Sequence, residues 1–121
     1  TLMRSSAASD VYKRQDYFEE YPYEYYLEAE RERLRKIQIK NLYEIAEHYK
    51  QNRDYAQAAN YYEKIIRIDP YEENAYLECC HVMLKVHAVL KARKIAEKMI
   101  YYVEGEMGIP CRDRLGNLFR E

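Results

Sequence analysis

The chain has 121 residues, of which 48% are hydrophobic, with three glycines, three prolines and no tryptophan, a composition that favours one compact helical domain. Its formal net charge of -1 argues against a free-standing nucleic-acid binder, because such proteins usually carry a basic excess. The three cysteines, Cys79, Cys80 and Cys111, have no repeated spacing, which predicts free thiols in a reducing cytoplasm.

The first stretch of the chain, "SSAASDVYKRQ" from Ser5 to Gln15, resembles a translated adapter of the kind ligated to fragments in sequencing libraries. We therefore expect residues 1–15 to be a non-native, disordered tail and residues 16–121 to be the native domain. The alternative is a natural flexible arm rich in serine and alanine. If the tail is a scar, the chain is a metagenomic fragment that lacks something upstream of Asp16.

From Asp16 onward the periodicity is helical. Residues 22 to about 51 predict one long helix with Pro22 in its first turn, and Glu32 pairs favourably with Lys36 four residues later. In the next helix Asp54 is placed to cap the N-terminus, and the Asp69-Pro70 pair ends it. Its predicted buried face consists of Tyr55, Ala58, Ala59, Tyr62, Ile65 and Ile66.

Two further helices and a short last one are predicted. The helix at about 72–86 buries Ala75, Tyr76, Cys79, Cys80 and Met83. The helix at about 88–107 buries Ala92, Ile95, Ala96, Met99, Val103 and Met107. Gly108 fits the left-handed position after a helix end, and Pro110 prevents continuation. Leu115, Leu118 and Phe119 make the last helix.

The two middle helix pairs are related by a 34-residue period. When Ile39 is the first position of the unit, Leu42, Ala46, Tyr49, Ala58, Tyr62, Ile65 and Pro70 match the pattern of large, small and aromatic residues of a tetratricopeptide repeat. Small residues let the two helices of a hairpin approach closely, and aromatic residues fill the gap to the next pair. The sequence therefore predicts an all-α, tetratricopeptide-like right-handed stack of antiparallel helix hairpins with about five helices.

Three segments then carry a resemblance: "PYEYYLEAERERLRK", "IAEHYKQNRDYAQAANYYEKIIRIDPYEENAY" and "EGEMGIPC". In this order and spacing, residues 16–121 resemble the bacterial transcriptional activator domain, the tetratricopeptide-like module of antibiotic regulatory proteins of the SARP type. The resemblance implies a module that follows a winged-helix DNA-binding domain, activates transcription, and pairs with a second copy or with the transcription machinery. This fragment alone is then not expected to bind DNA sequence-specifically. The alternative is a generic tetratricopeptide scaffold unrelated to transcription.

Motifs for chemistry are missing from the sequence. The "CCH" at Cys79 to His81 suggests a metal site, but adjacent helical residues point about 100° apart and cannot converge on one ion. His48, His81 and His87 have no evident acid-base partner, and no phosphate loop or nucleophile motif is present. We therefore predict no enzyme, no metal and no cofactor. No window approaches the roughly 18 apolar residues of a membrane helix.

A protein-binding groove is expected on the first helix of each pair, as in tetratricopeptide proteins. The candidate positions are Lys40, Tyr43, Glu47, Lys50, Gln51, Asn74, Leu77, His81, Leu84 and Lys85. Their mixture of aliphatic, aromatic and charged groups suits a peptide or a neighbouring domain, although each of them fits an ordinary solvated face equally well.

Two further groups of residues, the tyrosines and a set of lysines, each allow two interpretations. The tyrosines Tyr17, Tyr21, Tyr23, Tyr25 and Tyr26 are expected to pack in part against a neighbouring domain, whereas Tyr49, Tyr55, Tyr62 and Tyr76 are expected to pack in the core. Lys91, Lys94 and Lys98 form a basic stripe that is either solvated or docks near DNA phosphates in a full-length regulator.

Overall fold

The structure is a computed structural model that describes the backbone of residues 16–120 and the side chains of residues 22–120, so the expected tail at residues 1–15 lies outside it. Its elements are α2 (Asp16–Gln51), α3 (Tyr55–Ile68), α4 (Glu73–Lys85), α5 (Val89–Met99), the π-helix η1 (Ile100–Glu106) and α6 (Arg112–Arg120). No strand occurs between residues 16 and 120. The prediction of an all-α fold with about five helices is confirmed.

The chain divides into two compact units, residues 1–37 and residues 38–121, and the boundary falls inside α2. In the first unit no side chain between residues 22 and 37 is buried. Its helix is held by local ion pairs between Glu28 and Arg31, Glu30 and Arg33, and Glu32 and Arg35. Tyr23, Tyr25, Tyr26, Leu34 and Ile37 are exposed.

Two predictions for this unit were wrong. Pro22 lies inside α2, which begins at Asp16, and not in the first turn. The helix continues across the proline although its missing N–H leaves the carbonyl four residues earlier without its usual donor. Glu32 pairs with Arg35, three residues away, and not with Lys36, although both spacings lie on the same helix face.

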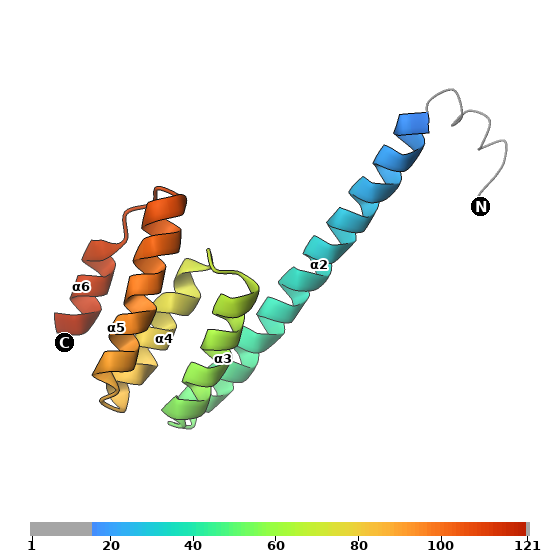
Figure 1. The fold of residues 1–121 in the computed structure, drawn as a ribbon. Coiled ribbons are helices and arrows are strands. Elements are labelled where there is room, and N and C mark those ends of the chain that lie inside the picture. The colour runs from blue at the N-terminus through green and yellow to red at the C-terminus, as the bar shows by residue number, and fades with distance from the viewer. Residues whose placement is uncertain (1–15, 121) are drawn as a thin grey trace. The chain divides into compact units, whose positions relative to one another are not determined.

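In the second unit α3 packs on α4, and α4 packs on both α5 and α6. The consecutive helices run in alternating directions (Figure 1). The largest completely buried side chains are Tyr62, Tyr76, Ile65, Ile66, Met99, Val82, Val103, Cys79, Cys80 and Cys111. The predicted core positions Ala58, Ala75 and Ala92 are also completely buried. One continuous core therefore runs from α3 through α4 to α5.

The boundaries of α3 follow from local chemistry. The carboxylate of Asp54 accepts a hydrogen bond from the backbone N–H of Gln57 at 3.4 Å, which satisfies one free donor of the first turn. At the other end Asp69 is extended, with φ -138°, because Pro70 disfavours the helical conformation of the residue before it. The predicted cap and stop are both confirmed.

The turns before α3 and before α5 have the same backbone geometry. Arg53 and His87, which lie 34 positions apart, both adopt the left-handed conformation, with φ of 62° and 63°. In the first turn the N–H of Asp54 donates to the carbonyl of Tyr49, and in the second the N–H of Ala88 donates to that of Met83 at the same offset. The 34-residue period of the sequence is therefore present in the backbone as well.

The predicted fourth helix is interrupted. It begins at Val89 as expected but changes at Ile100 into the π-helix η1, whose hydrogen bonds run from i to i+5. A π-helix advances fewer degrees per residue than an α-helix, so residues after it leave the face that α-helical periodicity predicts. Val103 stays buried, but Met107, predicted to be buried, is exposed. That prediction was wrong.

Hydrogen bonds to a carboxylate of η1 position the start of α6. Gly108 has φ 75°, as predicted, and ends the helical run. The Glu104 carboxylate then accepts hydrogen bonds from the backbone N–H of Cys111 at 3.3 Å and from the guanidinium of Arg112 at 2.9 Å. Within α6 the Leu115 side chain is buried, whereas Leu118 and Phe119 are half-buried.

Candidate functional site

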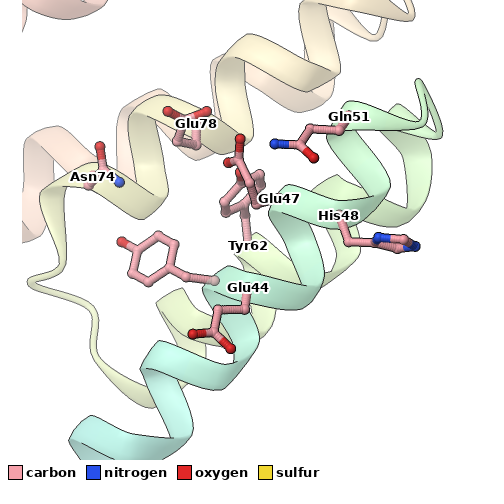
Figure 2. A pocket seen from close by; sticks show the side chains of 8 residues that line it. Glu44, Glu47, His48, Gln51, Tyr62, Asn74 and Glu78 are labelled. Atoms are coloured by element: carbon pink, nitrogen blue, oxygen red, sulfur yellow. The ribbon is translucent and has the colours of Figure 1, made fainter.

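A cleft of about 410 Å³ lies between the C-terminal part of α2 and α4, with α3 beneath it. The residues that line it are Tyr43, Glu44, Glu47, His48, Gln51, Tyr62, Asn74 and Glu78. Figure 2 shows Glu47 extending from α2 over Tyr62, and Asn74 and Glu78 placed on α4. All of these residues belong to the second unit, so this unit forms the cleft by itself.

Two aromatic rings form the apolar part of the cleft. The rings of Tyr43 and Tyr62 meet edge to face, with centroids 6.1 Å apart and planes inclined by 62°. The Tyr43 hydroxyl donates a hydrogen bond to the Glu72 carboxylate at 3.0 Å, which fixes its ring. Burial, followed by the charge of Glu72, raises the pKa of Tyr43 well above its usual value, so the phenol is neutral at pH 7.

One ion pair closes an end of the cleft. The ammonium of Lys50 on α2 donates to the carboxylate of Glu78 on α4 at 2.9 Å, and both side chains are half-buried. This hydrogen bond is the main cause that raises the pKa of Lys50. The pair ties α2 to α4, and the carboxylates of Glu44 and Glu47 on α2 form no ion pair with a described residue.

The structure brings together about half of the predicted groove positions. Tyr43, Glu47, Gln51 and Asn74 line the cleft, and Lys50 pairs across it. The remaining five positions, Lys40, Leu77, His81, Leu84 and Lys85, do not line it. Among these, Leu77 and Leu84 are partly buried and pack against the core, which gives them a structural role that the sequence pattern did not distinguish.

Four lining residues were missed by the sequence reasoning: Glu44, His48, Tyr62 and Glu78. Tyr62 was assigned only to the core, yet it also reaches the cleft floor. Glu44, His48 and Gln51 follow one another at spacings of four and three residues, so they share a helix face that the sequence could have revealed. Glu78 follows Asn74 by four residues in the same way.

The two adjacent cysteines point to different neighbours. The Cys79 thiol lies 3.9 Å from the carbonyl of Ala59 on α3, and the Cys80 thiol lies 3.4 Å from that of Ala92 on α5. Burial raises the pKa of Cys80 to about 12 and that of Cys79 further still. Both thiols therefore act as small core groups, and no cluster of three or more potential metal ligands occurs within the described residues.

A second hollow, of about 390 Å³, lies between α5, η1 and α6. It is mainly apolar, lined among others by Ala96, Ile100, Leu115 and Phe119. None of the predicted groove positions lies there. The predicted basic stripe of Lys91, Lys94 and Lys98 is exposed on α5 and lines neither hollow. The cleft between α2 and α4 is therefore the stronger candidate site.

Comparison of the chain with protein-family models, with curated proteins and with solved structures finds no match.

Within residues 16–120 no helix combines the length and the apolar character that a bilayer crossing needs.

Proposed function

We propose that this chain is a helical protein-interaction module of a bacterial transcriptional activator, built as a tetratricopeptide-like stack and coupled to a neighbouring winged-helix DNA-binding domain. The observation that carries the proposal is the repetition of one hairpin at a 34-residue period, with a cleft between the first helices of successive hairpins. Repeats of this kind act by presenting surfaces to other proteins.

Burial supports the assignment of the hairpin positions. Ala46 and Cys80 are equivalent in the period, as are Ala58 and Ala92, and all four have exposed fractions of 0%. Small side chains at these positions allow the backbones of a hairpin to approach closely. The proposed stack therefore agrees with the sizes of the residues as well as with their backbone geometry.

The lining of the cleft favours a protein segment as the ligand. Tyrosine rings offer broad apolar contact, and the amides of Gln51 and Asn74 can both donate and accept hydrogen bonds along a peptide backbone. The Tyr43 hydroxyl has a carboxylate partner, Glu72, but its pKa is raised well above the usual value, so it acts as a neutral hydrogen-bonding group and not as an activated nucleophile. We therefore propose a binding module without enzymatic activity.

The proposed compartment is the cytoplasm. All three cysteines are free and buried, which agrees with a protein that folds under reducing conditions. The proposed partners are the DNA-binding domain, a second copy of the module, or the transcription machinery.

A reporter assay tests the function. The whole chain is fused to a heterologous DNA-binding domain and expressed in bacteria with a promoter that carries the cognate operator. The fusion should raise transcription above that of the DNA-binding domain alone, and Asn74→Ala in the cleft should reduce the gain while Asn60→Ala, on the exposed face of α3, should not. A fusion with no more activity than the DNA-binding domain alone would contradict the transcriptional role and leave a generic scaffold.

A further inference from the structure

The cleft between α2 and α4 carries an excess of negative charge. Glu44 and Glu47 are exposed along the α2 wall and form no ion pair with a described residue. On the other side Glu78 is already paired with Lys50, and the Glu72 carboxylate accepts from Tyr43. The α2 wall therefore presents two carboxylates without an ion pair of their own, and of these Glu47 also lies close enough to Lys50 to raise the pKa of that ammonium.

A buried polar group lies beneath these carboxylates. Tyr62 is only 1% exposed, and its ring lies under Glu47 in the floor of the cleft (Figure 2). Its hydroxyl interacts with the Glu47 carboxylate, whereas the hydroxyls of Tyr43 and Tyr76 donate to Glu72 and to the carbonyl of Pro70. The phenol therefore helps to hold the Glu47 carboxylate over the floor of the cleft.

Two carboxylates lie close to the Tyr62 hydroxyl. Burial raises the pKa of Tyr62 above the usual value, and the nearby carboxylates of Glu78 and Glu47 raise it further. A hydrogen bond with Glu47 adds to this shift. The phenol is therefore neutral at pH 7 and keeps the proton that it donates to Glu47.

We propose that the cleft binds a lysine- or arginine-containing peptide segment, with one cationic side chain held by Glu44 and Glu47 on the α2 wall, beside Tyr43. The two carboxylates supply the counter-charge, and the half-buried Tyr43 ring, which meets Tyr62 edge to face, contacts the aliphatic stem. The Asn74 amide lies on the opposite wall, where it pairs with the peptide backbone.

A peptide fits these features better than a metal ion. No group of three or more potential metal ligands occurs among the described residues, and the cleft combines carboxylates with aromatic rings and amides, which a small hard cation does not use. The inference rests on the proposed interaction function, because it names the partner class of the same cleft.

Fluorescence anisotropy with the whole chain tests the inference. The probes are three labelled ten-residue peptides of alanine and leucine that carry three arginines, three glutamines or three glutamates. The arginine peptide should bind most tightly, at least about tenfold better than the glutamine peptide, and added salt should weaken it. Equal binding of the arginine and glutamine peptides, or tighter binding of the glutamate peptide, would overturn the inference. The polyamine spermidine should not displace the arginine peptide at equal charge concentration, and full displacement would also overturn it.

Variants locate the binding site. Glu47→Gln should weaken the arginine peptide about five- to tenfold and leave the glutamine peptide unchanged. Tyr62→Phe removes only the hydroxyl and should cause a smaller, several-fold loss, and Glu97→Gln on α5 should have no effect. Circular dichroism spectra check that each variant is folded. Unchanged affinity in folded Glu47→Gln would overturn the placement of the cation.

The two proposals fail in different ways. If the fusion activates the reporter but Glu47→Gln changes neither reporter output nor peptide binding, the cationic ligand is wrong and the interaction function stands. If the arginine peptide binds as described but the fusion is inactive, the ligand stands and the transcriptional role is wrong.

Discussion

The tyrosines of the first unit and those of the second unit belong to different physical environments. Tyr25 is 76% exposed on a helix held by local ion pairs, whereas Tyr76 is 0% exposed and its hydroxyl donates to the carbonyl of Pro70 at 2.6 Å. The residue type is the same, so composition alone could not separate them. The 34-residue period separates them, because Tyr76 occupies a core position of the second hairpin and Tyr25 lies outside the repeat.

This difference in exposure shows which interactions stabilise each unit. The second unit depends on burial in a continuous core, whereas the described part of the first unit has no buried side chain and forms ion pairs within its own helix. Exposed ion pairs contribute little to stability, and burial of large side chains contributes much. Substitutions should therefore have large effects in the second unit and small effects in the first.

Replacing one tyrosine of each unit by alanine should give the largest difference in the free energy of unfolding. Tyr76→Ala should lower the free energy of unfolding by about 3–5 kcal/mol, because it removes a buried ring and leaves a cavity. Tyr25→Ala should change it by less than about 0.5 kcal/mol. Urea denaturation followed by circular dichroism measures both, and similar midpoints for the two variants would contradict the assignment of the core.

Overpacking the hairpin should have the next largest effect. Ala58 is completely buried at the helix crossing, whereas Ala56 is exposed on the same helix. Ala58→Leu should cost about 1–3 kcal/mol because the added atoms force the helices apart. Ala56→Leu should be neutral within about 0.5 kcal/mol. Thermal unfolding compares the pair, and a neutral Ala58→Leu would show that the helices are not in close contact there.

The cap of α3 should contribute less. Asp54→Ala removes the side-chain acceptor of the first turn and should destabilise the unit by about 1 kcal/mol. Asp54→Asn retains a capping oxygen and serves as the control. The same urea series measures both variants, and equal losses for them would indicate that the cap does not act through its hydrogen bond.

The smallest effect concerns pH and the attachment of α6. The hydrogen bond from Arg112, with that from the Cys111 N–H, holds the pKa of Glu104 below its ordinary value. A lowered folded-state pKa stabilises the fold above the unfolded pKa, and this contribution is lost as pH falls through the lowered folded value. The amide NMR signal of Cys111 should therefore shift below about pH 4.5 in the native chain and not in Glu104→Gln. A signal that stays constant in the native chain would contradict this coupling.

Local signals predicted much of the fold. Asp54 and Pro70 fixed the ends of α3, and Gly108 marked the end of the helical run, because each acts on its own backbone. The π-helix could not be predicted, since an α-helical period was extrapolated through it, and Met107 was misplaced as a result. The start of α2 was predicted wrongly because Pro22 was placed in the first turn of the helix, whereas the helix begins at Asp16.

The candidate cleft was predicted only in part, for a physical reason. Tyr43, Glu47, Gln51 and Asn74 lie on first-helix faces that the repeat pattern identifies. Tyr62 serves both the core and the cleft, and periodicity assigns a residue to one face only. Whether Leu77 faces a groove or the core depends on the neighbouring helices, which a single sequence does not describe.

Chemical-shift mapping by NMR tests most directly whether the cleft is the binding surface. With the labelled chain and the arginine peptide, the largest shifts should occur at the amides of Tyr43, Glu47, Asn74 and Glu78, with Lys91 and Lys94 unchanged. Large shifts along α5 together with an unperturbed cleft would contradict the account.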